Sequence, residues 1–207
     1  LTITGATTIT ADSAGTKQDV TLTDASNDFS KTVSGTLGGA VGITGAAVSI
    51  RDTNDLVLGE TTTTGNYTVQ AGGGITDSGI LIIGTDSANR TASFTAGNGE
   101  TIILDHVNAS SQPVHDFSGA LTFAASSGNL AGLTVYAVDA IELAAFTLAA
   151  NDDALPCNLF LQSGTVTQSG AWVVAGTTTI SASGSDVTLS NTSNNFTGAV
   201  SITGHAV

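Results

Sequence analysis

Short segments of alternating apolar and polar residues run along the whole chain, and most are bounded by Gly, Asp or Asn. Examples are "DVTLTD" (19–24), "GAVGITG" (39–45) and "NYTVQA" (66–71). This period of two with turn residues at both ends predicts short β-strands that each bury one face. Ile3, Leu22 and Ile43 fall 19 and 21 positions apart, a spacing that predicts one turn of a parallel β-solenoid.

A longer repeat is superimposed on these strands. The stretches "TDASNDF" (23–29), "QPVHDF" (112–117) and "NTSNNF" (191–196) share a polar pair before a Phe. Their markers Phe29, Phe117 and Phe196 lie 88 and 79 positions apart, and we expect each ring to fill the interior of a coil. "ITDSG" (75–79) returns as "VTQSG" (166–170), 91 positions later. We therefore predict one solenoid segment, 1–207, made of superrepeats 1–79, 80–170 and a partial 171–207.

The predicted fold is an all-β parallel β-helix of about ten coils, each of about 20 residues. A β-sandwich of antiparallel hairpins is an alternative, because it also gives a strand about every 8 to 12 residues. The apolar stretch 131–150 contains good helix formers, but its alternation at Leu133/Val135 and Ile141/Leu143 favours strands. The last segment stops in mid-pattern without a cap, so we expect the solenoid to continue beyond this fragment.

Composition narrows the classes of function. The chain has 4 Lys+Arg against 17 Asp+Glu and a net charge of −13, which argues against nucleic acid as a partner. The single cysteine excludes an internal disulfide framework and a cysteine-rich zinc site. The mean hydropathy of +0.27 argues against disorder. Asp139 and Glu142 interrupt the stretch 131–150, so we expect no membrane insertion.

Several segments resemble the repeats of very large bacterial exoproteins, the filamentous-haemagglutinin-type and autotransporter-type adhesins. These are "NNFTGAVSITG" (194–204), "AAVSIRDTNDLVLG" (46–59), "YTVQAGGGITDSG" (67–79) and "TISASGSDVTLSN" (179–191). The resemblance implies a right-handed β-helix, a location outside the cell or on its surface, and a role in adhesion or aggregation. It indicates an architecture more specifically than a ligand.

Candidate chemistry is sparse. Hard oxygen ligands at Asp52, Asp55, Asp152 and Asp153 make calcium a candidate, although neither stretch matches an EF-hand loop. Otherwise no cofactor is expected. The carboxylates are spread among turns, which favours capping and solubility over acid–base catalysis. The three histidines show no metal spacing, and a Ser-His-Asp triad from "LDH" (104–106) and "VHD" (114–116) is the weaker interpretation.

Two insertions into the repeat, 106–115 and 148–157, are the expected places of partner contact, because loops on a rigid scaffold tolerate variation. The candidate contact residues are His106, His115, Asn151, Asp152 and Asp153. Five N-x-Ser/Thr triplets are candidate glycosylation sites; they begin at Asn66, Asn89, Asn108, Asn191 and Asn195.

We therefore expect a non-catalytic segment of a secreted or surface-displayed exoprotein that acts in adhesion, aggregation or filament building. Its expected partners are neighbouring repeats of the same long chain, copies of itself, cell-surface glycans or another cell. One alternative is a self-assembling extracellular filament or sheath subunit. The other is a polysaccharide-processing β-helix enzyme, which requires carboxylates clustered in a long groove.

Overall fold

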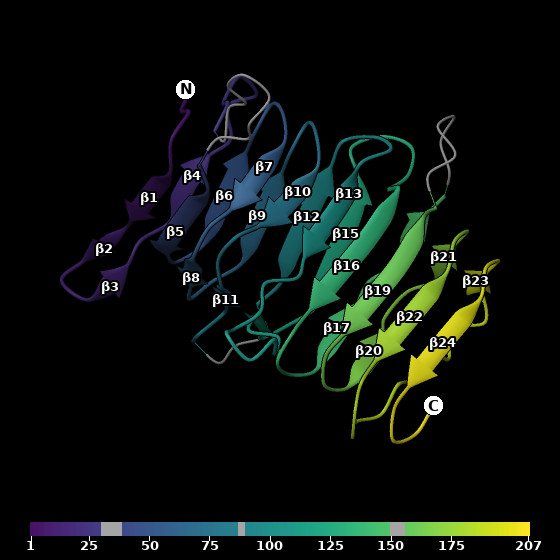
Figure 1. Ribbon diagram of the computed structural model, residues 1–207. Coiled ribbons are helices and arrows are strands. Elements are labelled where there is room, and N and C mark those ends of the chain that lie inside the picture. Colours follow the sequence, from purple (N-terminus) through teal and green to yellow (C-terminus); the bar gives the residue numbers. More distant parts are fainter. Residues whose placement is uncertain (30–38, 87–89, 150–155) are drawn as a thin grey trace.

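The computed structural model describes residues 1–29, 39–86, 90–149 and 156–207. This part of the chain is all-β and contains no helix. Except for one antiparallel hairpin, its strand ladders are parallel, so the antiparallel sandwich is excluded. The strands stack side by side from the N-terminal to the C-terminal region (Figure 1). The arrangement is compatible with the predicted β-solenoid.

The largest sheet has twelve strands. In order, eleven of them are β14 (Asp116–Phe117), β11 (Leu81–Ile83), β8 (Thr61–Thr63), β5 (Val41–Gly45), β7 (Leu56–Leu58), β10 (Ile75–Asp77), β13 (Thr101–Leu104), β16 (Gly132–Tyr136), β19 (Asn158–Gln162), β22 (Thr178–Ser181) and β24 (Val200–Thr203). The twelfth, β1 (Thr7–Thr10), also pairs with β5. The sheet forks at β5, because Val41 pairs with β7 while Thr44 and Gly45 pair with β8.

Two smaller parallel sheets complete the stack. The seven-stranded sheet has the order β20 (Val166–Gln168), β17 (Ile141–Leu143), β15 (Leu121–Ala125), β12 (Ala92–Ala96), β9 (Tyr67–Gln70), β6 (Val48–Arg51) and β4 (Val20–Leu22). The three-stranded sheet contains β18 (Phe146–Leu148), β21 (Trp172–Val174) and β23 (Asn195–Phe196). The stretch 131–150, as far as its residues are described, therefore forms strands, as its alternation predicts.

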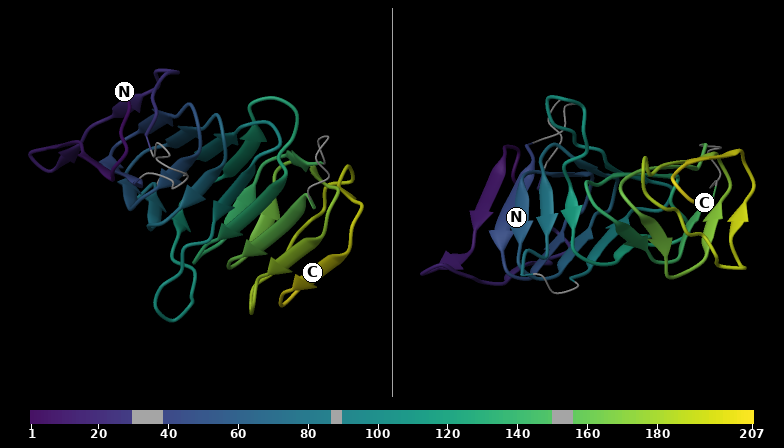
Figure 2. Two further views of the ribbon diagram at one scale, coloured as in Figure 1. Left: turned by 45° about the horizontal axis from the view of Figure 1, so that its top comes forward. Right: turned by 90° about the horizontal axis from the view of Figure 1, so that it is seen from below.

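The spacing along the chain is less uniform than predicted. Leu56 pairs with Ile75, 19 positions on, but Ile102 pairs with Leu133, 31 positions on. Thr7 pairs with Val41, 34 positions on. Part of that length is an unpredicted antiparallel hairpin, β2 (Asp12–Ser13) and β3 (Thr16–Lys17), whose tight turn at Ala14 and Gly15 has positive φ at both residues. The hairpin projects from the stack (Figure 2).

The pairing pattern of the first half recurs in the second. Ile75 pairs with Leu56, and Val166 pairs with Ile141 in the same way. The pairs Leu81–Thr61 and Ile83–Phe117 recur as Trp172–Phe146 and Val174–Phe196. We call β5–β14 unit 1 and the equivalent stretch β15–β23 unit 2. The boundaries 1–79, 80–170 and 171–207 themselves stay a prediction.

Equivalent strands of the two units lie in different sheets. β10 belongs to the twelve-stranded sheet, whereas its equivalent β20 belongs to the seven-stranded sheet. β11 likewise has its equivalent, β21, in the three-stranded sheet. The chain therefore does not return to the same sheet after one repeat unit. Equivalent surface positions consequently face different directions.

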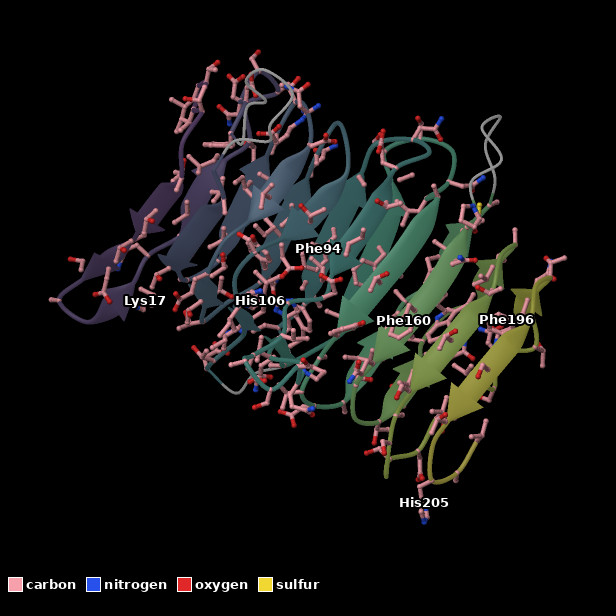
Figure 3. The ribbon with its side chains drawn as sticks, in the orientation of Figure 1. Lys17, Phe94, His106, Phe160, Phe196 and His205 are labelled. Atoms are coloured by element: carbon pink, nitrogen blue, oxygen red, sulfur yellow. The ribbon has the colours of Figure 1, made fainter. Side chains whose placement is uncertain are left out.

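The core is a continuous column of inward-facing residues. Alternation in β16 buries Leu133 and Val135, and alternation in β19 buries Leu159 and Leu161. Phe94 is fully buried at the centre of an aromatic cluster, with its ring centroid 5.5 Å from that of Phe123. Phe29 and Phe117 are buried as expected, and Phe196 is half-buried against the core. Phe94 and Phe196 are labelled in Figure 3.

Candidate functional site

The insertion 106–115, which we call the 106–115 loop, ends at a buried histidine. The side chain of His115 has no exposed surface, and its Nδ1 atom accepts a hydrogen bond of 3.1 Å from the main-chain N–H of Leu81. Its Nε2 atom lies 3.4 Å from Oδ2 of Asp77, whose side chain is also fully buried. The His115 ring faces the interior, and its contact with a partner stays a prediction.

Asp77 fixes both ends of the 106–115 loop. Its Oδ1 atom accepts a hydrogen bond of 2.8 Å from the main-chain N–H of Asp105, directly before the loop. Its Oδ2 atom faces His115 at the end of the loop. We call the contacts among Asp77, Leu81, Asp105 and His115 the clasp. The clasp gives the loop a defined base on the strand stack.

The outer part of the loop is a turn built on Asn108. Its Oδ1 atom accepts hydrogen bonds from the main-chain N–H groups of Ser110 and Gln112, at 2.9 and 3.1 Å. An antiparallel bridge between Val107 and Pro113 closes the neck. The residues between them are exposed, so this loop is accessible to a partner. His106 is half-buried, with its ring centroid 6.4 Å from that of His115, and its partner contact stays a prediction (Figure 3).

The second predicted contact segment lies largely outside the described residues. Asn151, Asp152 and Asp153 belong to the stretch 150–155, so neither their partner contact nor their calcium binding is addressed. Cys157, at the end of the insertion, is buried within the core, and this burial raises the pKa of its thiol. The residue serves as a small apolar side chain.

Unit 2 carries a neutral version of the clasp. Asn194 takes the place of His115, and its Oδ1 atom accepts a hydrogen bond of 2.9 Å from the main-chain N–H of Trp172. Gln168 takes the place of Asp77, and the two amides exchange hydrogen bonds of 2.9 Å in both directions. Gln168 also accepts from the main-chain N–H of Asn191. The polar residues before the repeated Phe are thus links between successive strands.

A shallow hollow of about 250 Å³ lies beside the loop. Its lining residues are Gln112, Pro113, Ala137, Val138, Gln162, Ser163, Ser181 and Ser183, all of them uncharged. The equivalent hollow of unit 1 measures about 130 Å³ and is lined by Arg51 and Asp52, among others. The same place in the repeat is therefore charged in one unit and neutral in the next.

Two aromatic rings on the outer face were missed by sequence reasoning. Tyr136 on β16 and Phe160 on β19 are half-buried, and their ring centroids lie 5.6 Å apart. The figure labels Phe160 on the broad face of the stack (Figure 3). The signal was present in the sequence, because both residues are out of phase with the apolar residues that alternate inward, Leu133/Val135 and Leu159/Leu161.

The calcium candidates that are described accept hydrogen bonds from main-chain N–H groups. Asp52 is 2% exposed, and its two carboxylate oxygens accept from the main-chain N–H groups of Phe29 and Asn54. Oδ1 of Asp55 accepts from the main-chain N–H of Gly74, at 2.8 Å. Burial raises the pKa of Asp52. These carboxylates therefore link neighbouring strands, and no group of three or more His, Cys, Asp or Glu suited to a metal ion occurs among the described residues.

Neighbouring carboxylates affect two aspartates. At Asp52, burial is the largest cause of the raised pKa, and the charges of Asp28 and Asp55 add to it. Burial, and then the nearby charge of Asp139, raise the pKa of Asp116. A hollow of about 610 Å³ contains Glu60 and His106 among otherwise uncharged lining residues. Neither the Asp116–Asp139 pair nor this hollow has the several clustered carboxylates that the enzyme alternative requires. In residues 1–29, 39–86, 90–149 and 156–207, no helix is long and apolar enough to cross a membrane.

Four of the five glycosylation candidates are described. Asn66, Asn108 and Asn195 are exposed, and Asn191 is half-buried. The side-chain oxygens of Asn66, Asn108 and Asn191 accept hydrogen bonds from main-chain N–H groups. Asn89 lies outside the described residues. Glycosylation at these positions stays a prediction.

Comparison with known families identifies the chain by its repeats. A family model described as repeats of unknown function (DUF5649) matches residues 1–36, 45–124 and 128–203, and the chain belongs to this family. The last two matches end in the equivalent strands β15 and β24, in step with the structural repeat. The family description names no adhesin. No curated protein and no solved structure matches the chain.

Proposed function

We propose that this chain is a non-catalytic structural and adhesive segment of a large secreted or surface-displayed bacterial exoprotein. The proposed scaffold is a right-handed parallel β-helix of about ten coils, as the spacing of the strands suggests. The observation that carries the proposal is the repetition itself. Equivalent pairings recur in units 1 and 2, and family repeats match most of the chain.

A repeated, rigid stack suits multivalent attachment. Each unit presents an outer face on a common scaffold, so weak contacts at successive units add through effective concentration. The two units keep the same buried framework but differ at their surfaces, for example at Arg51 and its equivalent Tyr136. This pattern supports a scaffold that displays contact surfaces.

The contacts of the carboxylates support a non-catalytic role. Asp52, Asp55 and Asp77 each accept hydrogen bonds from main-chain N–H groups of other strands or turns. Their arrangement stabilises corners of the stack, and these oxygens are engaged by the main chain. This favours an adhesive segment over the polysaccharide-processing alternative.

The test is an attachment assay with the chain of residues 1–207. Beads are coated with the chain at several densities and allowed to settle on bacterial or eukaryotic cell layers. We expect retention under flow to rise more steeply than linearly with coating density. Retention equal to that of albumin-coated beads would overturn the adhesive proposal. Release of reducing sugars from polysaccharides would favour the enzyme alternative, and continuous fibres in micrographs would favour a filament subunit.

A further inference from the structure

The aromatic rings of the described chain face inward with few exceptions. Tyr67, Phe94 and Trp172 have 1% exposure or less, as expected for large apolar side chains. Tyr136 and Phe160 instead stand on the outer face of the twelve-stranded sheet, in contact with one another. Outward aromatic pairs beside a hollow are a common mark of a binding surface.

Strand register places polar groups next to this pair. Tyr136 pairs with Gln162, which pairs with Ser181, so the three side chains form one outward row across β16, β19 and β22. Phe160 lies in the adjacent outward row, between Thr134 and Thr179. Gln162 and Ser181 also line the neutral hollow beside the 106–115 loop. We call Tyr136, Phe160, Gln162 and Ser181 the aromatic strip.

The fold does not require the two rings. In unit 1, Arg51 of β6 pairs with Gln70 of β9, just as Tyr136 of β16 pairs with Gln162 of β19 in unit 2. Arg51 therefore corresponds to Tyr136, and Gln70 to Gln162. By the same register, Thr68 corresponds to Phe160. The buried neighbours stay apolar in both units, as at Ile50 and Val135. Unit 2 thus carries aromatic residues at two surface positions that hold a cation, Arg51, and a hydroxyl, Thr68, in unit 1.

The chemistry of the strip fits a neutral saccharide chain. Aromatic faces pack against the C–H faces of sugar rings, while amide and hydroxyl groups exchange hydrogen bonds with sugar hydroxyls. Rows of residues on neighbouring strands repeat at about 4.8 Å, comparable to the length of one hexose unit. The strip and its hollow carry no charged side chain, so an ionic ligand gains no partner there.

Net charge disfavours the competing occupants. With a net charge of −13, the chain repels acidic polysaccharides and nucleic acids. Face-to-face association with a second copy meets the same repulsion. A neutral glycan is free of this cost.

We propose that the aromatic strip binds a neutral oligosaccharide, with Tyr136 and Phe160 stacking on sugar rings and Gln162 and Ser181 hydrogen bonding to hydroxyl groups. Gln112, beside the neck of the 106–115 loop, lines the adjoining hollow. This inference rests on the proposed adhesive function and names its ligand class. The test below separates the two.

The experiment compares the parent chain with the double variant Tyr136→Arg/Phe160→Thr. The variant installs the unit 1 residues, so the fold is expected to persist, with unchanged circular dichroism and urea midpoint. Val57→Thr, an outward change on β7 in the same sheet, is the matched control. Titration calorimetry uses neutral β-1,4-linked hexasaccharides of glucose, mannose, xylose and N-acetylglucosamine, with oligogalacturonate as the acidic comparison.

We expect the parent and Val57→Thr to bind at least one neutral hexasaccharide, and the double variant to bind it about tenfold or more weakly. The proposal is overturned by absence of binding to all four neutral probes, by preference for oligogalacturonate, or by equal affinity of the double variant. Parent dimers that the double variant abolishes in sedimentation would overturn it in favour of a second copy.

The bead assay distinguishes the two proposals. Beads that attach equally well with the parent and the double variant support adhesion and reject the strip as its contact. Saccharide binding in solution without bead attachment supports the strip and rejects adhesion.

Discussion

The Nδ1 atom of His115 accepts a hydrogen bond from the main-chain N–H of Leu81 at 3.1 Å, and Asn194 makes the same link to Trp172 in unit 2. The histidine version is less complete than the amide version. Nε2 of His115 and Oδ2 of Asp77 are 3.4 Å apart, beyond the usual hydrogen-bond range of about 2.7–3.2 Å, and neither atom has a hydrogen-bond partner among the described residues. The Asn194–Gln168 pair exchanges two bonds of 2.9 Å.

Replacing His115 by Ala is expected to destabilise the chain strongly. The change leaves the Leu81 N–H and the Asp77 carboxylate buried without the imidazole, and it opens a cavity. We expect the free energy of unfolding to fall by about 3 to 5 kcal/mol. Urea denaturation followed by circular dichroism measures the loss.

The double variant His115→Asn/Asp77→Gln is the matched control, because it installs the clasp of unit 2. Replacing a buried charged pair by well-packed apolar residues of similar volume is often neutral or stabilising, and the amide pair of unit 2 also satisfies its own hydrogen bonds. We expect the double variant to match the parent within about 1 kcal/mol or to exceed it. A double variant as unstable as His115→Ala would show that the two units do not share the clasp.

Truncating Phe94 tests the aromatic centre of the core. The ring lies 5.9 Å from Tyr67, 6.4 Å from Phe117 and 5.5 Å from Phe123, measured between centroids. We expect Phe94→Ala to lower the free energy of unfolding by about 3 to 5 kcal/mol. Phe94→Leu, which keeps most of the volume, is expected to cost less than about 1.5 kcal/mol. Equal losses for the two variants would contradict tight packing at this position.

The parallel strand stack could be predicted because its cause is local. Alternation at Leu133/Val135 and turn residues between segments specify which side chains face inward, whatever strand lies alongside. The recurrence of Phe29, Phe117 and Phe196 indicated the long repeat for the same reason. The polar residue two positions before each Phe also belonged to the pattern, although its role as a link to another strand was not evident.

The remaining features depend on partners distant in sequence. His115 is buried because Asp77 and Leu81, 38 and 34 positions earlier, form its surroundings, and no local pattern shows this. The fork at β5 and the shift of equivalent strands between sheets follow from pairings with variable spacing. The aromatic strip depends on the register between β16 and β19, which brings Tyr136 and Phe160 together.

Gly79 is expected to resist substitution because of a close backbone approach. A Cβ atom at Gly79 would lie 2.3 Å from the main-chain nitrogen of Glu60 on the neighbouring passage of the chain. The equivalent Gly170 would place one 2.5 Å from the nitrogen of Ala145. We expect Gly79→Ala to lower the free energy of unfolding by about 1 to 3 kcal/mol, because the main chain at Glu60 must move to make room for the methyl group.

Gly5 supplies the control for Gly79, because a Cβ atom there meets no atom of the described residues within 4 Å. Gly5→Ala is expected to be neutral or to stabilise by about 0.4 to 1 kcal/mol through the unfolded state. Thermal unfolding of both variants measures the difference. A Gly79→Ala variant that melts with or above Gly5→Ala would be evidence against the close stacking of these corners.

Asp52 is expected to give stability a component that falls as pH rises. Burial raises the pKa of this carboxyl above its ordinary value of 3.8, so the folded state holds the proton more tightly than the unfolded state. The contribution is therefore fully present below pH 3.8 and is lost as pH rises through the raised pKa. The hydrogen bonds from Phe29 and Asn54 oppose the shift without reversing it.

The measurement is the difference in free energy of unfolding between the parent and Asp52→Asn from pH 3 upward, a range of about four units. Asp52→Asn lacks the titrating group and cannot accept both main-chain hydrogen bonds, so it is expected to be less stable than the parent throughout. Its deficit is expected to be largest at the acidic end and to shrink as pH rises, because only the parent loses the proton-linked contribution. A deficit that grows with pH would mean that the two hydrogen bonds, rather than burial, control the titration of Asp52.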